Sequence, residues 1–221
     1  MAILPWRVRN AISEHFPLGY HLATNLFRRV RSGEYWDRRL EESWDERGWP
    51  TKGGIIASLT GPDDVLIDIA CGTGSILRDL KARGYRRLHG LEISRYAVNR
   101  LAAEGITMHH GSIPELPLPD AFYDVVIASQ VLEHVIRRNR FMREIVRVLK
   151  PGGTAFIFVP NDCLGPIDEP EHVIKYDEAS FRHFLGRHFA SVEVQVIKDA
   201  QHEMTILFGL ARSAPAGAPD A

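Results

Sequence analysis

The chain has 221 residues, of which 45% are hydrophobic and 25% are charged, and this length suffices for one substantial hydrophobic core. Its 27 basic and 28 acidic side chains leave a net charge of −1, which excludes a protein steered onto nucleic acid by its overall field. No run of about eighteen apolar residues is present, so we expect no transmembrane segment. Of the two cysteines, Cys71 lies inside a small-residue turn, where a structural disulfide is not expected, and this favours a reducing, cytoplasmic location.

The first 60 residues are rich in arginine, tryptophan and charge and contain no strand-like run. Between 33 and 49, large apolar side chains recur at close to helical spacing, at Tyr35, Trp36, Leu40 and Trp44. We expect two or three helices here, broken at Pro50 and Gly53-Gly54 before a further helix through Leu59. We interpret residues 1–60 as a helical extension that forms a lid over the domain that follows.

From residue 61 onward, short apolar runs alternate with helical segments. Strands are predicted over 65–69, 87–92, 106–110, 124–129, 154–160, 191–197 and 205–211. Helices are predicted over 75–83, 95–103, 140–149 and 177–188, the third of them stopped by Pro151-Gly152-Gly153. Unbroken apolar strands that alternate with helices indicate a parallel sheet covered on both faces, and the last two strands, which lack a helix between them, indicate an antiparallel edge.

The predicted fold is therefore α/β: a Rossmann-like, doubly wound, seven-stranded sheet that is mostly parallel, with an antiparallel edge strand and N-terminal helices. This domain is expected to span 61–212. The tail 213–221 has no apolar face and is expected to be disordered.

The turn Ala70-Cys71-Gly72-Thr73-Gly74 follows the first predicted strand, where doubly wound sheets bind ligands. Gly72 and Gly74 remove Cβ atoms where a ligand would approach, and the exposed amides at the helix start favour an electron-rich group. A dinucleotide-binding turn needs a third glycine, but Leu77 stands at that position. The carboxylate of Asp68, just before the turn, would repel a pyrophosphate and suits a cationic amino group.

Four segments in this order resemble the signatures of class I S-adenosylmethionine-dependent methyltransferases. They are "DIACGTG" from Asp68, "LHGLEIS" from Leu88, "HHGSIPELPLPDAFYDVVIASQVLEHV" from His109 and "LKPGG" from Leu149. The pattern is most similar to small-molecule enzymes of the kind found in ubiquinone and menaquinone biosynthesis, and it covers residues 64–211. The resemblance implies S-adenosylmethionine as the cofactor and methyl transfer as the activity.

The resemblance also implies cofactor-binding residues at four strand ends. Those that line the methionine and ribose parts are Asp68, Ala70, Gly72 and Gly74. Glu92 would accept hydrogen bonds from both ribose hydroxyls, because a carboxylate offers two acceptor oxygens to a vicinal diol. The others implied are Ile93 and Ile113 at the adenine, Ser112 at its amino group, and Ser129 and Gln130 beneath the transferred methyl group.

Two of these assignments carry a second interpretation. Ser112 stands where the family often has an acidic residue, so its contact to the adenine amino group competes with a plain turn role. In related enzymes an aromatic residue of the leading helices closes over the sulfonium, and Tyr35 would take that place here. The alternative for Tyr35 and Trp36 is an apolar helix stripe that packs on the sheet.

A general base is needed only if the methyl acceptor must lose a proton. His134 and His172 follow the fourth and fifth strands at the expected site, and we select them as candidate catalytic residues; His202 is placed less clearly. The acidic group around His172 has no recognised metal-ligand spacing, so a solvated loop and no metal are predicted; it consists of Asp162, Asp168, Glu169 and Glu171.

The predicted partner is a small-molecule acceptor methylated at oxygen or nitrogen, with no nucleic acid and with a monomer or homodimer as the assembly. Arginine clusters at Arg28, Arg29 and Arg31 and between Arg137 and Arg147 leave a peripheral membrane contact open beside an ordinary solvated face. Two other functions stay open at this point. One is an NAD(P)-dependent oxidoreductase on a similar sheet, and the other is a regulatory protein that binds S-adenosylmethionine without catalysis.

Overall fold

The computed structural model describes residues 8, 11, 12, 15, 16, 33–44, 48–161, 172–199, 202 and 204–217. The strands are β1 (Leu66–Ile69), β2 (Leu88–Glu92), β3 (Thr107–His110), β4 (Tyr123–Ser129), β5 (Leu149–Pro160), β6 (Ser191–Asp199) and β7 (Met204–Arg212). The helices are α3 (Gly33–Glu42), α4 (Pro50–Leu59), α5 (Ser75–Ala82), α6 (Arg95–Ala103), α7 (Arg138–Val148), α8 (Glu178–Gly186) and the short 3-10 helix η1 (Leu132–His134).

The seven strands form one sheet in the order β3-β2-β1-β4-β5-β7-β6. All neighbouring pairs from β3 to β5 are parallel, whereas β7 runs antiparallel to both β5 and β6. The strand order reverses between β1 and β4, so the carboxyl end of β1 is the place where such a sheet opens a crevice. The predicted Rossmann-like fold with an antiparallel edge is confirmed.

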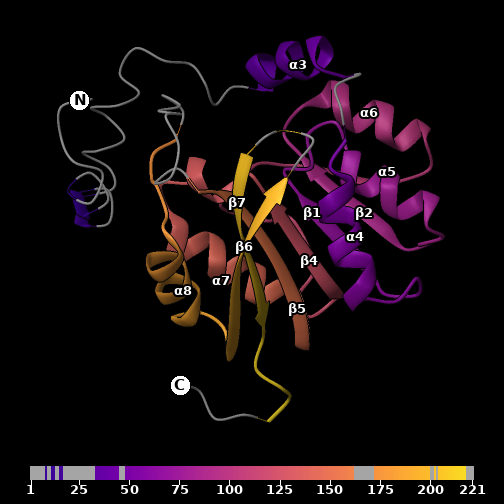
Figure 1. Cartoon of the computed structure of the whole chain (residues 1–221). Helices are drawn as coiled ribbons and strands as arrows, with labels where there is room; N and C mark the ends of the chain where they lie inside the picture. The colour runs from indigo at the N-terminus through magenta and orange to yellow at the C-terminus, as the bar shows by residue number, and fades with distance from the viewer. Residues whose placement is uncertain are drawn as a thin grey trace.

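Two hydrophobic layers cover the sheet. Figure 1 shows α4, α5 and α6 on one face and α7 and α8 on the other. Alternate residues of each strand belong to opposite layers: Leu66 packs with the α4–α6 layer and Ile67 with the α7–α8 layer. In the same way Val125 and Ile127 of β4 join the α4–α6 layer. The alternation places Asp68 and Ser129, two predicted site residues, on the α4 side of the sheet.

Two predicted breaks are wrong. Gly53 and Gly54 lie inside α4, where a Cβ atom on Gly53 would collide with the Asp79 carboxylate of α5 and displace that side chain. Pro50 begins this helix instead of preceding it, a position where its missing N–H costs nothing. The third predicted helix ends at Val148, and Pro151-Gly152-Gly153 lies within β5.

No helix within the described ranges is long and apolar enough to cross a membrane. Past β7, the Ser213 hydroxyl donates to the Lys150 carbonyl at 2.8 Å, and the Gly152 amide donates to the Ala214 carbonyl at 3.0 Å.

Candidate active site

The turn after β1 has three residues with left-handed backbone angles, with φ of 56° at Ala70, 55° at Gly72 and 72° at Gly74. A Cβ atom on Gly72 would meet Leu40 Cδ2 of α3 at 3.7 Å, an ordinary contact. A Cβ atom on Gly74 would lie 2.5 Å from Leu101 Cδ2 of α6, inside the collision range. The missing Cβ of Gly74 therefore makes room for the buried Leu101, a packing reason for glycine beside the ligand approach that the sequence predicts.

Asp68 lies near the end of β1 with 2% of its surface exposed. Its Oδ1 atom has no hydrogen-bond partner among the residues that the structure describes. Burial raises the pKa of this carboxyl to about 8; the Lys52 ammonium opposes the rise, and Glu92 adds to it. A buried carboxyl group with an unused oxygen is what an incoming ammonium group would satisfy.

Glu92 ends β2 and holds the backbone of two turns together. Its Oε1 atom accepts hydrogen bonds from the amides of Ile93 at 2.8 Å and Ser94 at 3.0 Å, and its Oε2 atom accepts one from Gly72 at 2.9 Å. Burial raises the pKa of Glu92, and these amide donors oppose the rise. Because each carboxylate oxygen has two lone pairs, one acceptor position remains on Oε2. A bound ribose would thus find one free acceptor position on Glu92, unless one of the three hydrogen bonds from backbone amides breaks.

Helix α3 is attached to the turn that carries Glu92. Asp37 Oδ1 accepts hydrogen bonds from the Ser94 hydroxyl at 2.6 Å and from the Tyr96 amide at 3.1 Å, and the Ser94 bond lowers the pKa of Asp37. Figure 1 shows α3 beside α6 at the strand ends where β1 and β2 finish. The rings of Tyr35 and Trp36 meet edge to face at 5.3 Å. The sequence pattern did not single out Asp37, since its partners are 57 and 59 residues away.

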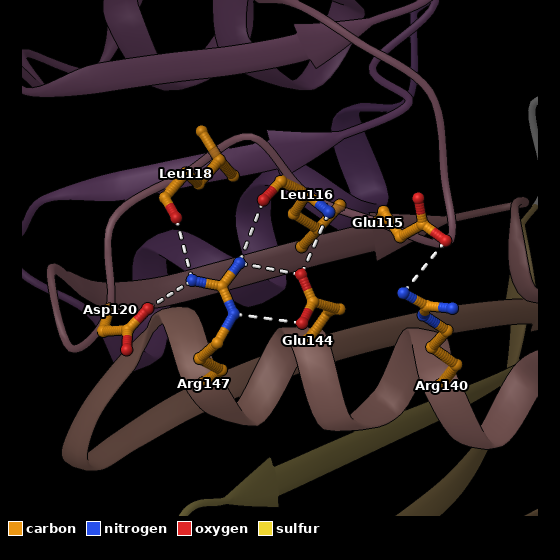
Figure 2. Close-up of polar contacts among 7 residues, drawn as sticks. All are labelled: Glu115, Leu116, Leu118, Asp120, Arg140, Glu144 and Arg147. Carbon is orange, nitrogen blue, oxygen red and sulfur yellow. Dashed lines mark hydrogen bonds and ion pairs between the residues drawn. The ribbon is translucent and has the colours of Figure 1, made fainter.

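The loop between β3 and β4 is fastened to α7 by one arginine (Figure 2). Arg147 donates to the carbonyl oxygens of Leu116 and Leu118, each at 2.9 Å, and to the Glu144 carboxylate at 2.7 Å. Glu144 in turn accepts from the Leu116 amide at 3.0 Å, and Asp120 completes the network with a further ion pair to Arg147. The loop is held through its backbone, which fixes its path whatever its side chains are.

That loop carries two predicted site residues. Ser112 is exposed, and Ile113 is half-buried against the α7–α8 layer. Just before them, His110 Nε2 lies 3.0 Å from the Ile93 carbonyl oxygen, which joins the ends of β2 and β3. Ile93, Ser112 and Ile113 therefore belong to adjacent strand ends.

Replacing Arg147 with methionine should lower the free energy of unfolding by about 1–3 kcal/mol, because buried or half-buried carbonyl groups and Glu144 lose their donor. The measurement is urea unfolding, with hydrogen exchange of residues 111–122 to locate the loosening. Arg140→Met is the matched control: its ion pair with Glu115 is exposed, and its loss should cost less than about 0.5 kcal/mol. Equal effects of the two variants would contradict the role given to Arg147.

The end of β4 brings in a residue that the sequence prediction missed. Ser129 Oγ accepts a hydrogen bond from Lys52 Nζ of α4 at 2.9 Å, and this lysine has 0% of its surface exposed. Next to it, Gln130 has a φ of 55°, and its amide donates to the Phe158 carbonyl at 2.8 Å. A signal was present in the sequence: Lys52 precedes Ile55 and Ile56 by three and four positions, which puts a charge on the apolar face of the helix.

The two candidate catalytic histidines lie together. The Val173 amide donates to the Glu133 carbonyl at 2.8 Å, and this bond brings the His172 ring edge to face with His134 at 4.9 Å. Side-chain ligand atoms of Glu133, His134 and His172 lie within 4.8 Å of one another. Donors on one zinc ion lie about 3.3 Å apart, given bonds of about 2.0–2.1 Å, so the group is looser than a formed site. His202 stacks on the Trp49 ring at 3.7 Å.

Several residues that the sequence singled out lie outside the described residues. They are Cys163, the acidic residues Asp162, Asp168, Glu169 and Glu171, and the arginines Arg28, Arg29 and Arg31.

Comparisons with known proteins agree with this geometry. Residues 67–157 match the family model described as a methyltransferase domain. The chain is 36% identical over 129 residues to a probable S-adenosylmethionine-dependent methyltransferase of Mycolicibacterium smegmatis, covering 58% of this chain and 46% of that protein. It is 32% identical over 146 residues to the ubiquinone/menaquinone biosynthesis C-methyltransferase UbiE of Caulobacter vibrioides, covering 59% and 56%.

Among solved structures, the fold is similar to the 1,6-didemethyltoxoflavin-N1-methyltransferase of Burkholderia thailandensis. The TM-score is 0.64 at 17% identity, covering 96% of this chain and 92% of that one. The sheet order and the glycine turn with acids at two strand ends are those expected of a class I S-adenosylmethionine-dependent methyltransferase domain, and residues 67–157 are similar to that family. The chain spans about half the length of the curated relatives that it matches.

Proposed function

We propose that this chain transfers a methyl group from S-adenosylmethionine to an oxygen or nitrogen atom of a small molecule. The observation that carries the proposal is Asp68: a carboxyl group buried at the strand-order reversal, with an oxygen that lacks a partner among the described residues. Such a group fits the cationic amino end of the cofactor. The UbiE relative is named a C-methyltransferase of ubiquinone and menaquinone biosynthesis, which supports a small-molecule acceptor and leaves the choice of oxygen or nitrogen to the proposal.

The residues at the β1 and β2 ends fit the cofactor. S-adenosylmethionine supplies an activated methyl group on a sulfonium, so the protein needs chiefly to bind and align the reactants. In this proposal Asp68 holds the amino group, and Glu92 holds the ribose through Oε2. The remaining cofactor contacts are assigned to Ala70, Gly72, Gly74, Ile93, Ser112, Ile113, Ser129 and Gln130.

Helix α3 is proposed as the lid over this site. Its Asp37 accepts a hydrogen bond from Ser94 in the β2–α6 turn, and its Leu40 lies near Gly72, which supports a lid over the two turns assigned to the cofactor. Tyr35 on the same helix is the aromatic residue proposed to close over the sulfonium. An aromatic face stabilises a nearby cation by about 0.5–2 kcal/mol.

The acceptor is proposed to bind past the ends of β4 and β5. Ser129 and Gln130 lie at that edge, and His134 and His172 meet on one side of it. Either imidazole is suited to contact the acceptor and to donate or accept a hydrogen bond there.

The test is calorimetry with S-adenosylhomocysteine, followed by methyl transfer from labelled S-adenosylmethionine to a panel of hydroxylated and amino-bearing metabolites. We expect saturable binding and a labelled product whose methyl group is on oxygen or nitrogen. Binding without transfer to any acceptor would favour the regulatory protein, and a methyl group on carbon would overturn the choice of atom. Binding of a nicotinamide cofactor alone would revive the oxidoreductase, which gains no support from the buried Leu77 of α5.

A further inference from the structure

Lys52 is a lysine held away from water at the acceptor side of the site. It has 0% of its surface exposed, although lysine is almost never fully buried without a purpose or a partner. Its Nζ atom lies 2.9 Å from Ser129 Oγ, 3.4 Å from the centroid of the Trp49 ring and 5.6 Å from that of Phe158. Ser129 and Trp49, which contact the amine, are themselves half-buried.

The contacts of Lys52 with the described residues satisfy the N–H groups of a neutral amine and leave an ammonium one donor short. An ammonium has three N–H donors. Within the described part of the chain, Lys52 Nζ donates one hydrogen bond, to Ser129 Oγ, and a second N–H is directed at the face of the Trp49 ring. A neutral amine has two N–H groups, which those two contacts satisfy, and a lone pair that remains available. Burial lowers the pKa of Lys52 to about 7, and Glu133, Asp68 and Asp199 oppose that fall.

The surroundings also favour the amine after it gains a proton. Carboxyl groups face it from three elements: Asp68 from β1, Glu133 from η1 and Asp199 from β6. From β4 the Lys52 amine meets the Ser129 hydroxyl. His202 stacks on the Trp49 ring, and its Nδ1 atom lies 2.9 Å from Asp199 Oδ1. A base in this place is neutral in a useful fraction at neutral pH and is stabilised as a cation once protonated.

We propose that Lys52 is the catalytic base of this site, taking the proton that a hydroxyl or N–H acceptor loses when it is methylated. This inference rests on the proposed methyl transfer and assigns a residue that neither the sequence pattern nor the comparisons indicate. The acceptor oxygen or nitrogen bonds to the methyl carbon while the sulfur–methyl bond breaks, and the electron pair of that bond stays on sulfur. The acceptor's proton passes to Lys52 Nζ, directly or through the Ser129 hydroxyl, and the amine becomes an ammonium.

The first experiment needs no acceptor. The chain has five lysines, so the pKa of each can be followed by NMR of ¹³C-lysine-labelled protein, with the Lys52→Met spectrum to assign the signal. We expect Lys52 to titrate near neutral pH and to have a pKa about one unit lower with S-adenosylmethionine than with S-adenosylhomocysteine, because only the former carries a sulfonium charge nearby. A pKa near 10.5 in the free protein, or equal values in the two complexes, would overturn the proposal.

The second experiment uses the acceptor found by the metabolite panel. Lys52→Met and Lys52→Arg should both lose about 10²- to 10⁴-fold in transfer rate, since neither side chain takes a proton at neutral pH, while binding S-adenosylhomocysteine within about threefold of wild type. The matched control is Lys198→Met on β6, an exposed lysine whose replacement should leave the rate unchanged. Wild-type rates with an unaltered pH profile in either Lys52 variant would refute the assignment. Failure of the wild-type chain to bind S-adenosylhomocysteine would instead refute the proposed function itself.

Discussion

Replacing Gly74 with alanine is expected to lower the free energy of unfolding by about 2–4 kcal/mol. About 1 kcal/mol of this comes from forcing a non-glycine residue to a φ of 72°. About 1–3 kcal/mol comes from overpacking, because the new Cβ atom would lie 2.5 Å from Leu101 Cδ2, and Leu101 is fully buried on α6 and has little room to move. Urea unfolding of the two proteins gives the difference directly.

Gly72→Ala is the matched control in the same turn. Its φ of 55° imposes a similar backbone cost, but its Cβ atom meets Leu40 at an ordinary 3.7 Å. We expect a loss of about 1 kcal/mol, without the overpacking. If the two alanine variants are equally stable, the collision with Leu101 does not explain the glycine at 74.

The fold could be predicted from the sequence because its strands are short apolar runs with helical segments between them. The order of the strands in the sheet did not follow from those runs. The failures were local conflicts that tertiary packing decided. Gly53 looked like a helix breaker, yet it lies inside α4, where its missing Cβ leaves room for the Asp79 carboxylate of α5.

The site was predictable where its residues follow the ends of the predicted strands. Asp68 and Glu92 lie at or near the ends of consecutive parallel strands; Asp68 was indicated by the turn that follows it, and Glu92 by the resemblance to methyltransferases. Lys52 and Asp37 come from helices that precede the sheet, and their partners are 77 and 57 residues away. Nothing local in a sequence reports such a pairing, although a lysine on an apolar helix face is a reason to look for one.

Replacing Asp68 with asparagine is expected to weaken the binding of S-adenosylmethionine by about 2–5 kcal/mol, the cost of removing one partner from a buried, hydrogen-bonded charge pair. Asparagine keeps the shape and one acceptor oxygen but lacks the negative charge that an ammonium group requires. Calorimetric titration of the two proteins at pH 8 measures this difference. Wild-type affinity in the asparagine variant would show that the cofactor's amino group lies elsewhere.

The pH dependence of binding separates the charge from the shape. In the free protein, burial holds the pKa of Asp68 at about 8, so the carboxyl group is mostly protonated at neutral pH. An ammonium ligand favours the ionised form, so binding should release a proton and the affinity should rise with pH, by at most about tenfold per unit from Asp68, until about pH 8. Lys52, with its pKa at about 7, adds to the rise because its ammonium form repels the same ligand.

Stability should move in the opposite direction to binding. The pKa of Asp68 is about 8 when folded and near 3.8 when unfolded, so the native state holds an extra proton between these values. The contribution of the protonated Asp68 to the free energy of unfolding is therefore complete below about pH 4 and is lost progressively as the pH rises to about 8. Asp68→Asn removes this loss, so we expect the variant to gain stability relative to wild type as the pH rises through that window while it binds the cofactor poorly. Thermal unfolding of both proteins at pH 5 and pH 8 tests this expectation. If the stability of the variant relative to wild type falls as the pH rises, Asp68 is not buried in its neutral form.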